Sequence, residues 1–233
     1  QPAAVWVSLH TADPGGTGVN EVSAGWYGRQ QPASGWNAAT ITGATNNGQI
    51  SWNAVTGSNV TVTHVGLWDA STGGTFLLGI DVSDKLFVVG AVPKINDAAM
   101  TVVPGAAYSN YLIPLITDHM LGGPAMTFDT TLFLALYTSN PTAADSGTEV
   151  SGGGYARRVI EVDAPSNDAT DNVSEIDFGT ASANLGTITH YGIRTASSAG
   201  NLHVFGEWTT GRQVDNGDDY KVPDGDLDFT AVS

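Results

Sequence analysis

The stretch Glu21-Val22-Ser23-Ala24-Gly25-Trp26-Tyr27-Gly28-Arg29 recurs, about 128 residues later, as Glu149-Val150-Ser151-Gly152-Gly153-Gly154-Tyr155-Ala156-Arg157. Two further blocks recur at nearly the same offset: 9–14 matches 136–141, and 62–67 matches 188–193. Chance does not hold such a register over three blocks. The chain is therefore predicted to be a tandem duplication of one small domain.

Each copy is about 110 residues long, which is enough to bury a core of its own, and the boundary is expected near residue 103. The predicted domains are 1–102 and 103–233. Only 13% of the residues are charged, about half the usual share. Short runs of β-formers, such as 5–9 and 60–68, are separated by turns rich in Gly, Pro and Asp. This pattern predicts a mainly β protein with two tandem antiparallel sandwich-like or barrel-like domains.

One segment breaks the β pattern. Between residues 106 and 121, Leu112, Leu115, Ile116 and Met120 are spaced to form one helical stripe. The pair Gly122-Gly123 is a plausible helix stop. The pattern predicts a helix over about 106–121, before the second β domain, beginning near Ser109 or near Pro114.

Charge and composition exclude several functions. The net charge of −15 would repel nucleic acid and anionic membranes, so neither is expected as a partner. The absence of cysteine excludes disulfides and thiolate metal sites. No stretch approaches the roughly 18 apolar residues of a membrane span.

The recurring Tyr and Arg residues are expected to be internal fixtures. In each copy an aromatic residue is followed two positions later by Arg, and a Glu stands upstream. The ring would pack and the guanidinium would tie down loop carbonyls or that carboxylate. The two predicted sets are Glu21, Tyr27 and Arg29 in the first copy and Glu149, Tyr155 and Arg157 in the second.

The sequence contains no catalytic pattern. His64 and His190 occupy equivalent positions, but no pair of histidines has metal-ligand spacing. We expect both to be half-buried strand residues that form hydrogen bonds, with one site per domain as the alternative. No Gly-x-Ser-x-Gly elbow or distinct carboxylate pair is present, and the acidic turns do not match a calcium loop. No catalytic residue, metal or cofactor is therefore predicted.

Tryptophan offers a binding hypothesis. Trp26 and Trp36 flank a loop rich in Gly, Pro and Ser and are candidates for exposed rings that stack on a sugar. Core packing is the alternative.

Several motifs resemble those of a known family. Residues 9–14, 152–157 and 63–67 followed by 69–74 are similar to small virion proteins of tailed bacteriophages, known as tail-fibre-like or minor structural proteins. In that family a helix of the Leu-Leu-Asp-His-Leu-Leu-Gly type precedes the first strand, and residues 116–122 resemble it. The resemblance covers nearly all of residues 5–233. Members are commonly single-copy, so the duplication is a departure.

The resemblance implies a structural component of the virion exterior, made in the bacterial host cytoplasm. It would work through assembly contacts with other virion proteins and with itself, as a trimer or hexamer, and not through catalysis. Tail fibre and capsid decoration protein both remain open. The alternative function is a glycan-binding or receptor-binding module used in host adsorption.

Overall fold

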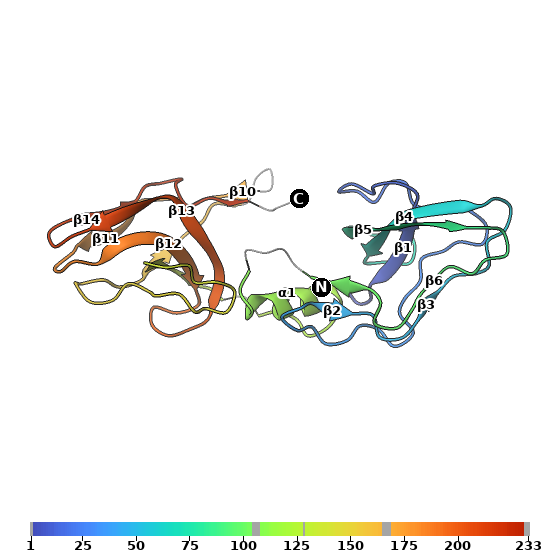
Figure 1. The fold of residues 1–233 in the computed structure, drawn as a ribbon, viewed down its shortest axis with the longest axis horizontal. Helices are drawn as coiled ribbons and strands as arrows, with labels where there is room; N and C mark the ends of the chain where they lie inside the picture. The colour runs from blue at the N-terminus through green and yellow to red at the C-terminus, as the bar shows by residue number, and fades with distance from the viewer. Residues whose placement is uncertain (1, 104–107, 128, 165–168, 231–233) are drawn as a thin grey trace. The chain divides into compact units, whose positions relative to one another are not determined.

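The computed structural model describes residues 2–103, 108–127, 129–164 and 169–230. The chain divides into two compact units. Unit 1 comprises residues 1–103 and 114–126, and unit 2 comprises residues 104–113 and 127–233 (Figure 1).

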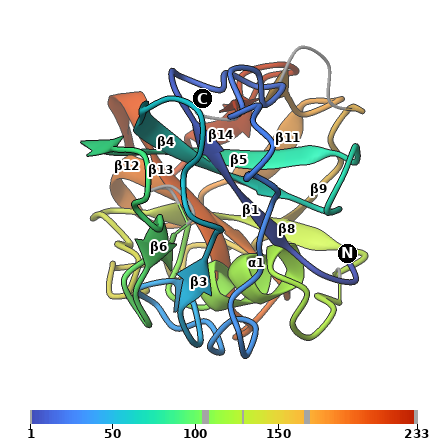
Figure 2. The ribbon, with the colours of Figure 1, turned by 90° about the vertical axis from the view of Figure 1, so that its right-hand side faces the viewer.

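Unit 1 is organised around a three-stranded antiparallel sheet (Figure 2). Its strand order is β1 (Trp6–His10), β4 (Val60–Trp68), β5 (Phe76–Phe87). Two short antiparallel pairs complete the unit: β2 (Ala44–Thr45) with β7 (Thr101–Val102), and β3 (Ile50–Ser51) with β6 (Lys94–Ile95).

Unit 2 is organised around a four-stranded antiparallel sheet. Its order is β13 (Leu202–Val214), β12 (Gly186–Arg194), β8 (Leu132–Tyr137), β9 (Arg158–Ile160). The short pairs are β10 (Ala169–Thr170) with β15 (Phe229–Thr230), and β11 (Ile176–Thr180) with β14 (Asp219–Val222). The mainly β, antiparallel architecture predicted from the sequence is confirmed.

Strand register is the same in the two units. His64 lies opposite His10 and Asp81, while His190 lies opposite Tyr137 and Glu207. In unit 1 a single bridge joins Val7 to Gln30, at the position where β8 and β9 pair in unit 2.

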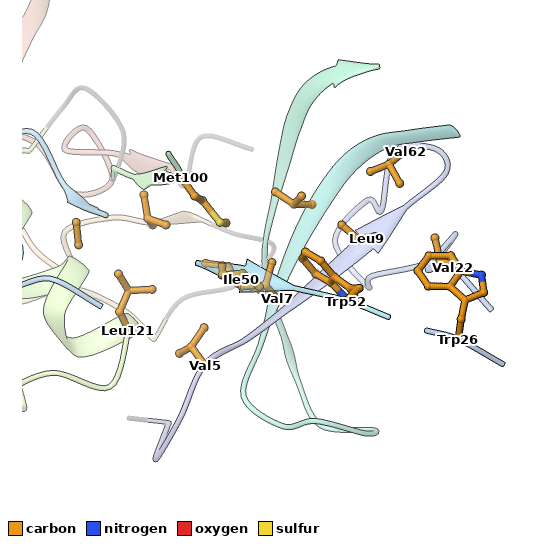
Figure 3. Packing of buried hydrophobic residues seen from close by; sticks show 14 of the residues in the cluster. Val5, Val7, Leu9, Val22, Trp26, Ile50, Trp52, Val62, Met100 and Leu121 are labelled. Atoms are coloured by element: carbon orange, nitrogen blue, oxygen red, sulfur yellow. The ribbon is translucent and has the colours of Figure 1, made fainter. Parts of the chain in front are cut away.

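The core of unit 1 lies between its sheet and the short pairs. Figure 3 shows Val7 and Leu9 from β1 directed towards Ile50 and Trp52. Leu121, which follows the helix, is part of the same cluster. Burial of alternate strand residues on one sheet face supplies most of the driving force for such a fold.

The described residues contain one helix, α1 (Leu112–Met120), which lies inside the predicted range and begins between the two predicted starting points, Ser109 and Pro114. Ser109 caps it, because its Oγ and carbonyl oxygen accept hydrogen bonds from the Leu112 amide at 3.2 and 3.1 Å. A cap residue is not itself helical, so the helix cannot extend back to residue 108. Pro114 lies in the first turn, where a missing N–H is tolerated. Residues 106 and 107 lie outside the described part of the chain.

The predicted helix stop is present. Gly122 has a φ of 80°, and the Gly123 amide donates to the Asp118 carbonyl at 2.7 Å. A glycine in the left-handed conformation commonly ends an α-helix in this way. Over the described ranges, α1 and every other helical segment fall short of the length and apolarity that a bilayer crossing requires.

Candidate functional site

Glu21, Tyr27 and Arg29 meet in unit 1. Arg29 forms a bidentate ion pair with the Glu21 carboxylate. Its Nε lies 2.9 Å from Oε1 of Glu21, and its Nη2 lies 2.8 Å from Oε2. The Tyr27 hydroxyl donates to the same Oε1 at 2.7 Å. We call these three residues the unit 1 clamp.

The clamp joins three segments of the chain. Glu21 is bridged to His10 at the end of β1, and the Tyr27 hydroxyl accepts a hydrogen bond from the Leu9 amide at 3.1 Å. Nη1 of Arg29 donates to the carbonyls of Ala70 and Gly73 in the β4–β5 turn, at 3.1 and 2.7 Å.

Unit 2 has the same arrangement, which we call the unit 2 clamp. Arg157 binds both carboxylate oxygens of Glu149 at 2.7 Å, and the Tyr155 hydroxyl donates to Glu149 at 3.0 Å. Nη1 of Arg157 donates to the carbonyls of Ala196 and Ala199, at 2.8 and 2.6 Å. The structure thus brings together each set of three residues that the sequence had grouped.

Burial and hydrogen bonds shift the pKa values of three clamp residues. Burial alone would raise the pKa of the Glu21 carboxyl, but the hydrogen bonds from Arg29 and Tyr27 outweigh it, so that pKa is lowered. Burial, together with the neighbouring carboxylate, raises the pKa of Tyr27 and also that of Tyr155. Both tyrosine hydroxyls therefore stay protonated at neutral pH, and the lowered pKa of Glu21 keeps its carboxylate from acting as a general base, which would need a pKa near neutral pH.

The two repeated histidines lie in strands. Nδ1 of His64 is 2.8 Å from the Thr63 hydroxyl, and its Nε2 is 3.9 Å from Asp81. His190 has the same 2.8 Å contact with Thr189. Both rings are half-buried. Within the described ranges, no group of three or more His, Cys, Asp or Glu side chains could hold a metal ion.

The glycine two positions after His64, Gly66, is required for steric reasons. A Cβ on Gly66 would lie 2.5 Å from Oγ of Ser8 and 2.6 Å from Nε2 of His10. We expect Gly66→Ala to lower the free energy of unfolding by about 1–3 kcal/mol through overpacking, measured by urea denaturation. Gly25→Ala is the matched control, because nothing lies within 4 Å of a Cβ there. Equal effects of the two substitutions would contradict this account.

The two candidate tryptophans differ. Trp26 is only 5% exposed and packs in the core (Figure 3), so the expectation of an exposed ring is wrong for this residue. The apolar ring is held inside by contact with Tyr27, at a ring-centroid distance of 5.9 Å. Trp36 is half-buried and lines a cavity of about 570 Å³ together with Gln31, Asn37 and Asp118.

Sequence reasoning missed a buried asparagine. Asn46 is fully buried, and its Nδ2 donates to the carbonyls of Gly48 and Asn96, both at 2.8 Å. Its Oδ1 accepts from the Met100 amide at 2.9 Å. One side chain thus satisfies three backbone groups, one of them two residues away at Gly48 and two in the distant segment that contains Asn96 and Met100.

Asn172 does the same in unit 2. Its Nδ2 donates to the carbonyls of Ser174 and Pro223 at 2.8 Å, and its Oδ1 accepts from the Leu227 amide at 2.9 Å. The only available signal was the 126-residue spacing between these two asparagines, which falls within the offsets of the repeated blocks.

The units differ in a second buried polar network. In unit 1, Trp68 donates from Nε1 to the Ser8 hydroxyl at 2.9 Å, and that hydroxyl lies 2.7 Å from Nε2 of His10. In unit 2, Arg194 contacts the Tyr137 hydroxyl and forms an ion pair with Asp145 at 2.6 Å. The clamps are therefore common to the units, whereas their neighbours have diverged.

Acid is expected to destabilise unit 1 through His10. The Val19 carbonyl, 2.8 Å from Nδ1, can only accept, so Nδ1 carries a proton, and the neutral ring then accepts at Nε2 from the Ser8 hydroxyl at 2.7 Å. Burial lowers the pKa of His10 below its ordinary 6.5, outweighing the opposing effect of the Val19 hydrogen bond. The unfolded state therefore binds the proton first, and stability present above pH 6.5 is lost as the pH falls through the folded pKa.

The measurement is urea unfolding of the full chain from pH 7.5 to 5. The urea midpoint should fall less with decreasing pH in His10→Gln than in the unaltered chain. Amide protection in β1 shows that the change lies in unit 1. An unchanged pH dependence in that variant would contradict the assignment.

Comparison with known protein families gives a match. A family described as Podophage GP4 fiber I protein gp80 matches residues 1–102 and 107–230. No curated protein matches the chain.

Proposed function

Since the chain belongs to the Podophage GP4 fiber I protein gp80 family, we propose that it serves the fibre as two tandem copies of one module that act through assembly contacts. Family membership makes the chain a structural component of the phage fibre and part of the virion, and not an enzyme. Contacts with other virion proteins follow from that role.

The two clamps are the main support for the proposal that the chain is a tandem duplication. Both units join a carboxylate, a tyrosine and an arginine to the carbonyls of an equivalent turn, with matching donors and acceptors. The buried asparagines and the common strand register support the same conclusion. The proposed copies are 1–102 and 103–233.

We further propose a homo-oligomer, a trimer or a hexamer, which would present six or twelve similar modules. Symmetric assembly is the usual way for a small domain to build an extended object. Exposed apolar side chains in both units, among them Val88, Val89, Val159 and Val162, support such contacts.

Location and copy number test the assembly role. A cryo-EM map of the intact particle should place this chain in the tail fibre, at a handful of copies, with both units in ordered density. Hundreds of copies on the capsid would instead mean a decoration protein. Light scattering of the purified chain gives the oligomer, and a monomer at virion-like concentrations would contradict self-assembly.

Exchange of the clamped turn tests the equivalence of the modules. Residues 69–75 are placed where 195–201 stand. Arg157 should still find its two carbonyls, and the unfolding midpoint should stay the same or rise, since Gly73 replaces Ala199, whose φ is 51°. Loss of amide protection around Arg157 would count against the duplication.

Glycan binding is a second candidate because of the cavity at Trp36. That cavity combines an aromatic wall with amide and carboxylate groups from Gln31, Asn37 and Asp118, a mixture that suits sugar recognition. Host polysaccharide should bind the intact chain and fail to bind Trp36→Ala. Absence of binding to the unaltered chain would remove this candidate.

A further inference from the structure

A second cavity of unit 1 is apolar. It has a volume of about 580 Å³ and lies between strands β4 and β5 and the segment 92–101. Val65, Val82 and Pro93 form part of its wall, and Trp52 forms another part. The indole of Trp52 is 4% exposed, and its Nε1–H has no acceptor among the described residues.

Unit 2 has aromatic rings at the corresponding positions. Tyr191 and Trp208 follow the paired His190 and Glu207, just as Val65 and Val82 follow the paired His64 and Asp81. Lys221 and Lys94 occupy equivalent positions in their strand pairs. Tyr220, which precedes Lys221, therefore corresponds to Pro93, which precedes Lys94.

These rings fill unit 2 from within. The ring centroids of Tyr191 and Trp208 lie 4.7 Å apart, and Tyr220 is buried. The hollow that remains there has a volume of about 370 Å³. The space that aromatic side chains fill in unit 2 is therefore open in unit 1.

The mouth of the unit 1 cavity is basic. Lys85 and Lys94 line it and are exposed. They are two of the three basic residues between 1 and 103, and the third, Arg29, is held in the unit 1 clamp. Among the residues that the structure describes, no carboxylate lines the cavity, in a chain with 23 acidic residues. An acidic occupant would be favoured at this mouth.

The surroundings suit a polypeptide. Strand β5 is the last strand of its sheet, and an extended segment can add to such an edge through backbone hydrogen bonds. Leu86, Val88 and Val89, at the end of β5, are each more than half exposed. A segment lying there would cover apolar surface while one side chain enters the cavity.

We propose that this cavity is a docking site for an acidic segment of another virion protein, which inserts an aromatic side chain between Val65, Val82 and Pro93. The carboxylates of that segment pair with Lys85 and Lys94. The identity of the partner as a virion protein rests on the proposed function, whereas the chemistry of the site does not.

The test uses the full chain and a fluorescent peptide, Asp-Glu-Trp-Glu-Asp with blocked ends, in an anisotropy titration. The matched peptides carry Ala in place of Trp, or Lys in place of the acids. Saturable binding of the first peptide alone is expected. Val82→Trp, which copies Trp208, should weaken it at least about tenfold by filling the cavity, and so should the surface variant Lys85→Ser with Lys94→Ser, which leaves the core intact.

Three results would overturn the proposal: no saturable binding, equal binding of the Ala peptide, or unchanged affinity in both variants. Dissociation of a homo-oligomer by Val82→Trp would instead make a second copy the occupant and would also overturn it. These outcomes are independent of the cryo-EM location, so failure of the docking site and failure of the fibre role can be told apart.

Discussion

Arg29→Ala is expected to lower the free energy of unfolding by about 3 kcal/mol. The substitution leaves the Glu21 carboxylate, whose side chain is 21% exposed, without its cation. It also removes the donor to the carbonyls of Ala70 and Gly73, and the guanidinium that stacks 3.4 Å from the Trp68 ring centroid. The partial exposure of Glu21 holds the expected cost at the lower end of the range for broken buried pairs.

Urea denaturation gives the size of this effect, and amide hydrogen exchange gives its place. Protection should fall in residues 21–29 and in the 69–75 turn. Arg29→Lys should recover less than half of the loss, because an ammonium cannot form the two-nitrogen fork. Lys85→Ala, at an exposed cation, is the control and should change little. Equal effects of Arg29→Ala and Lys85→Ala would show that the clamp does not stabilise the unit.

Arg157→Ala should produce a similar loss in unit 2, since Arg157 makes the same set of contacts. The loss of protection should then fall at 149–157 and 195–201. Such a mirrored result in the two units would add to the evidence that one module was copied.

The clamps were predictable from the sequence because their residues are close in the chain and recur. Glu21 and Arg29 are only eight residues apart, and few basic residues compete for the carboxylate. The contacts of Arg29 with Ala70 and Gly73 were not predictable, since they depend on which turn the sheet brings alongside.

The core position of Trp26 was not predicted, and the start of the helix was predicted only to within the range from Ser109 to Pro114, for a related reason. A tryptophan flanked by small residues can face either way, and only the packing of Tyr27 and Val22 against it places it inside. The helical stripe likewise says nothing about Ser109, whose side chain is engaged with the Leu202 carbonyl of a distant strand as well as with the helix.

The open cavity of unit 1 was also outside the reach of the sequence. Val82 and Trp208 both read as ordinary strand residues. The difference matters only when the register of β4 with β5, and of β12 with β13, shows that they occupy equivalent positions. The pairing of strands thus reveals a difference in packing between the units that residue patterns alone do not.

Asn46→Asp is expected to cost about 3–5 kcal/mol, although the two side chains have almost the same shape. Nδ2 of Asn46 donates to the carbonyls of Gly48 and Asn96, whereas a carboxylate only accepts. The substitution therefore places an oxygen against two carbonyl oxygens in a fully buried site, leaving both without a donor at roughly 1–3 kcal/mol each.

The response to pH separates this cause from a general loss of packing. The buried carboxyl of Asn46→Asp should bind a proton well above the ordinary pKa of Asp, because burial and the two carbonyls both disfavour its charge. Its folded pKa would be raised, so part of the lost stability should return as the pH falls from 7 towards 5. Since His10 lowers stability over the same range, the comparison is the difference from the unaltered chain at each pH. Asn46→Leu, which has no titrating group, should show no such recovery, and equal pH profiles for the two variants would mean that the hydrogen bonds of Asn46 do not set the stability of unit 1.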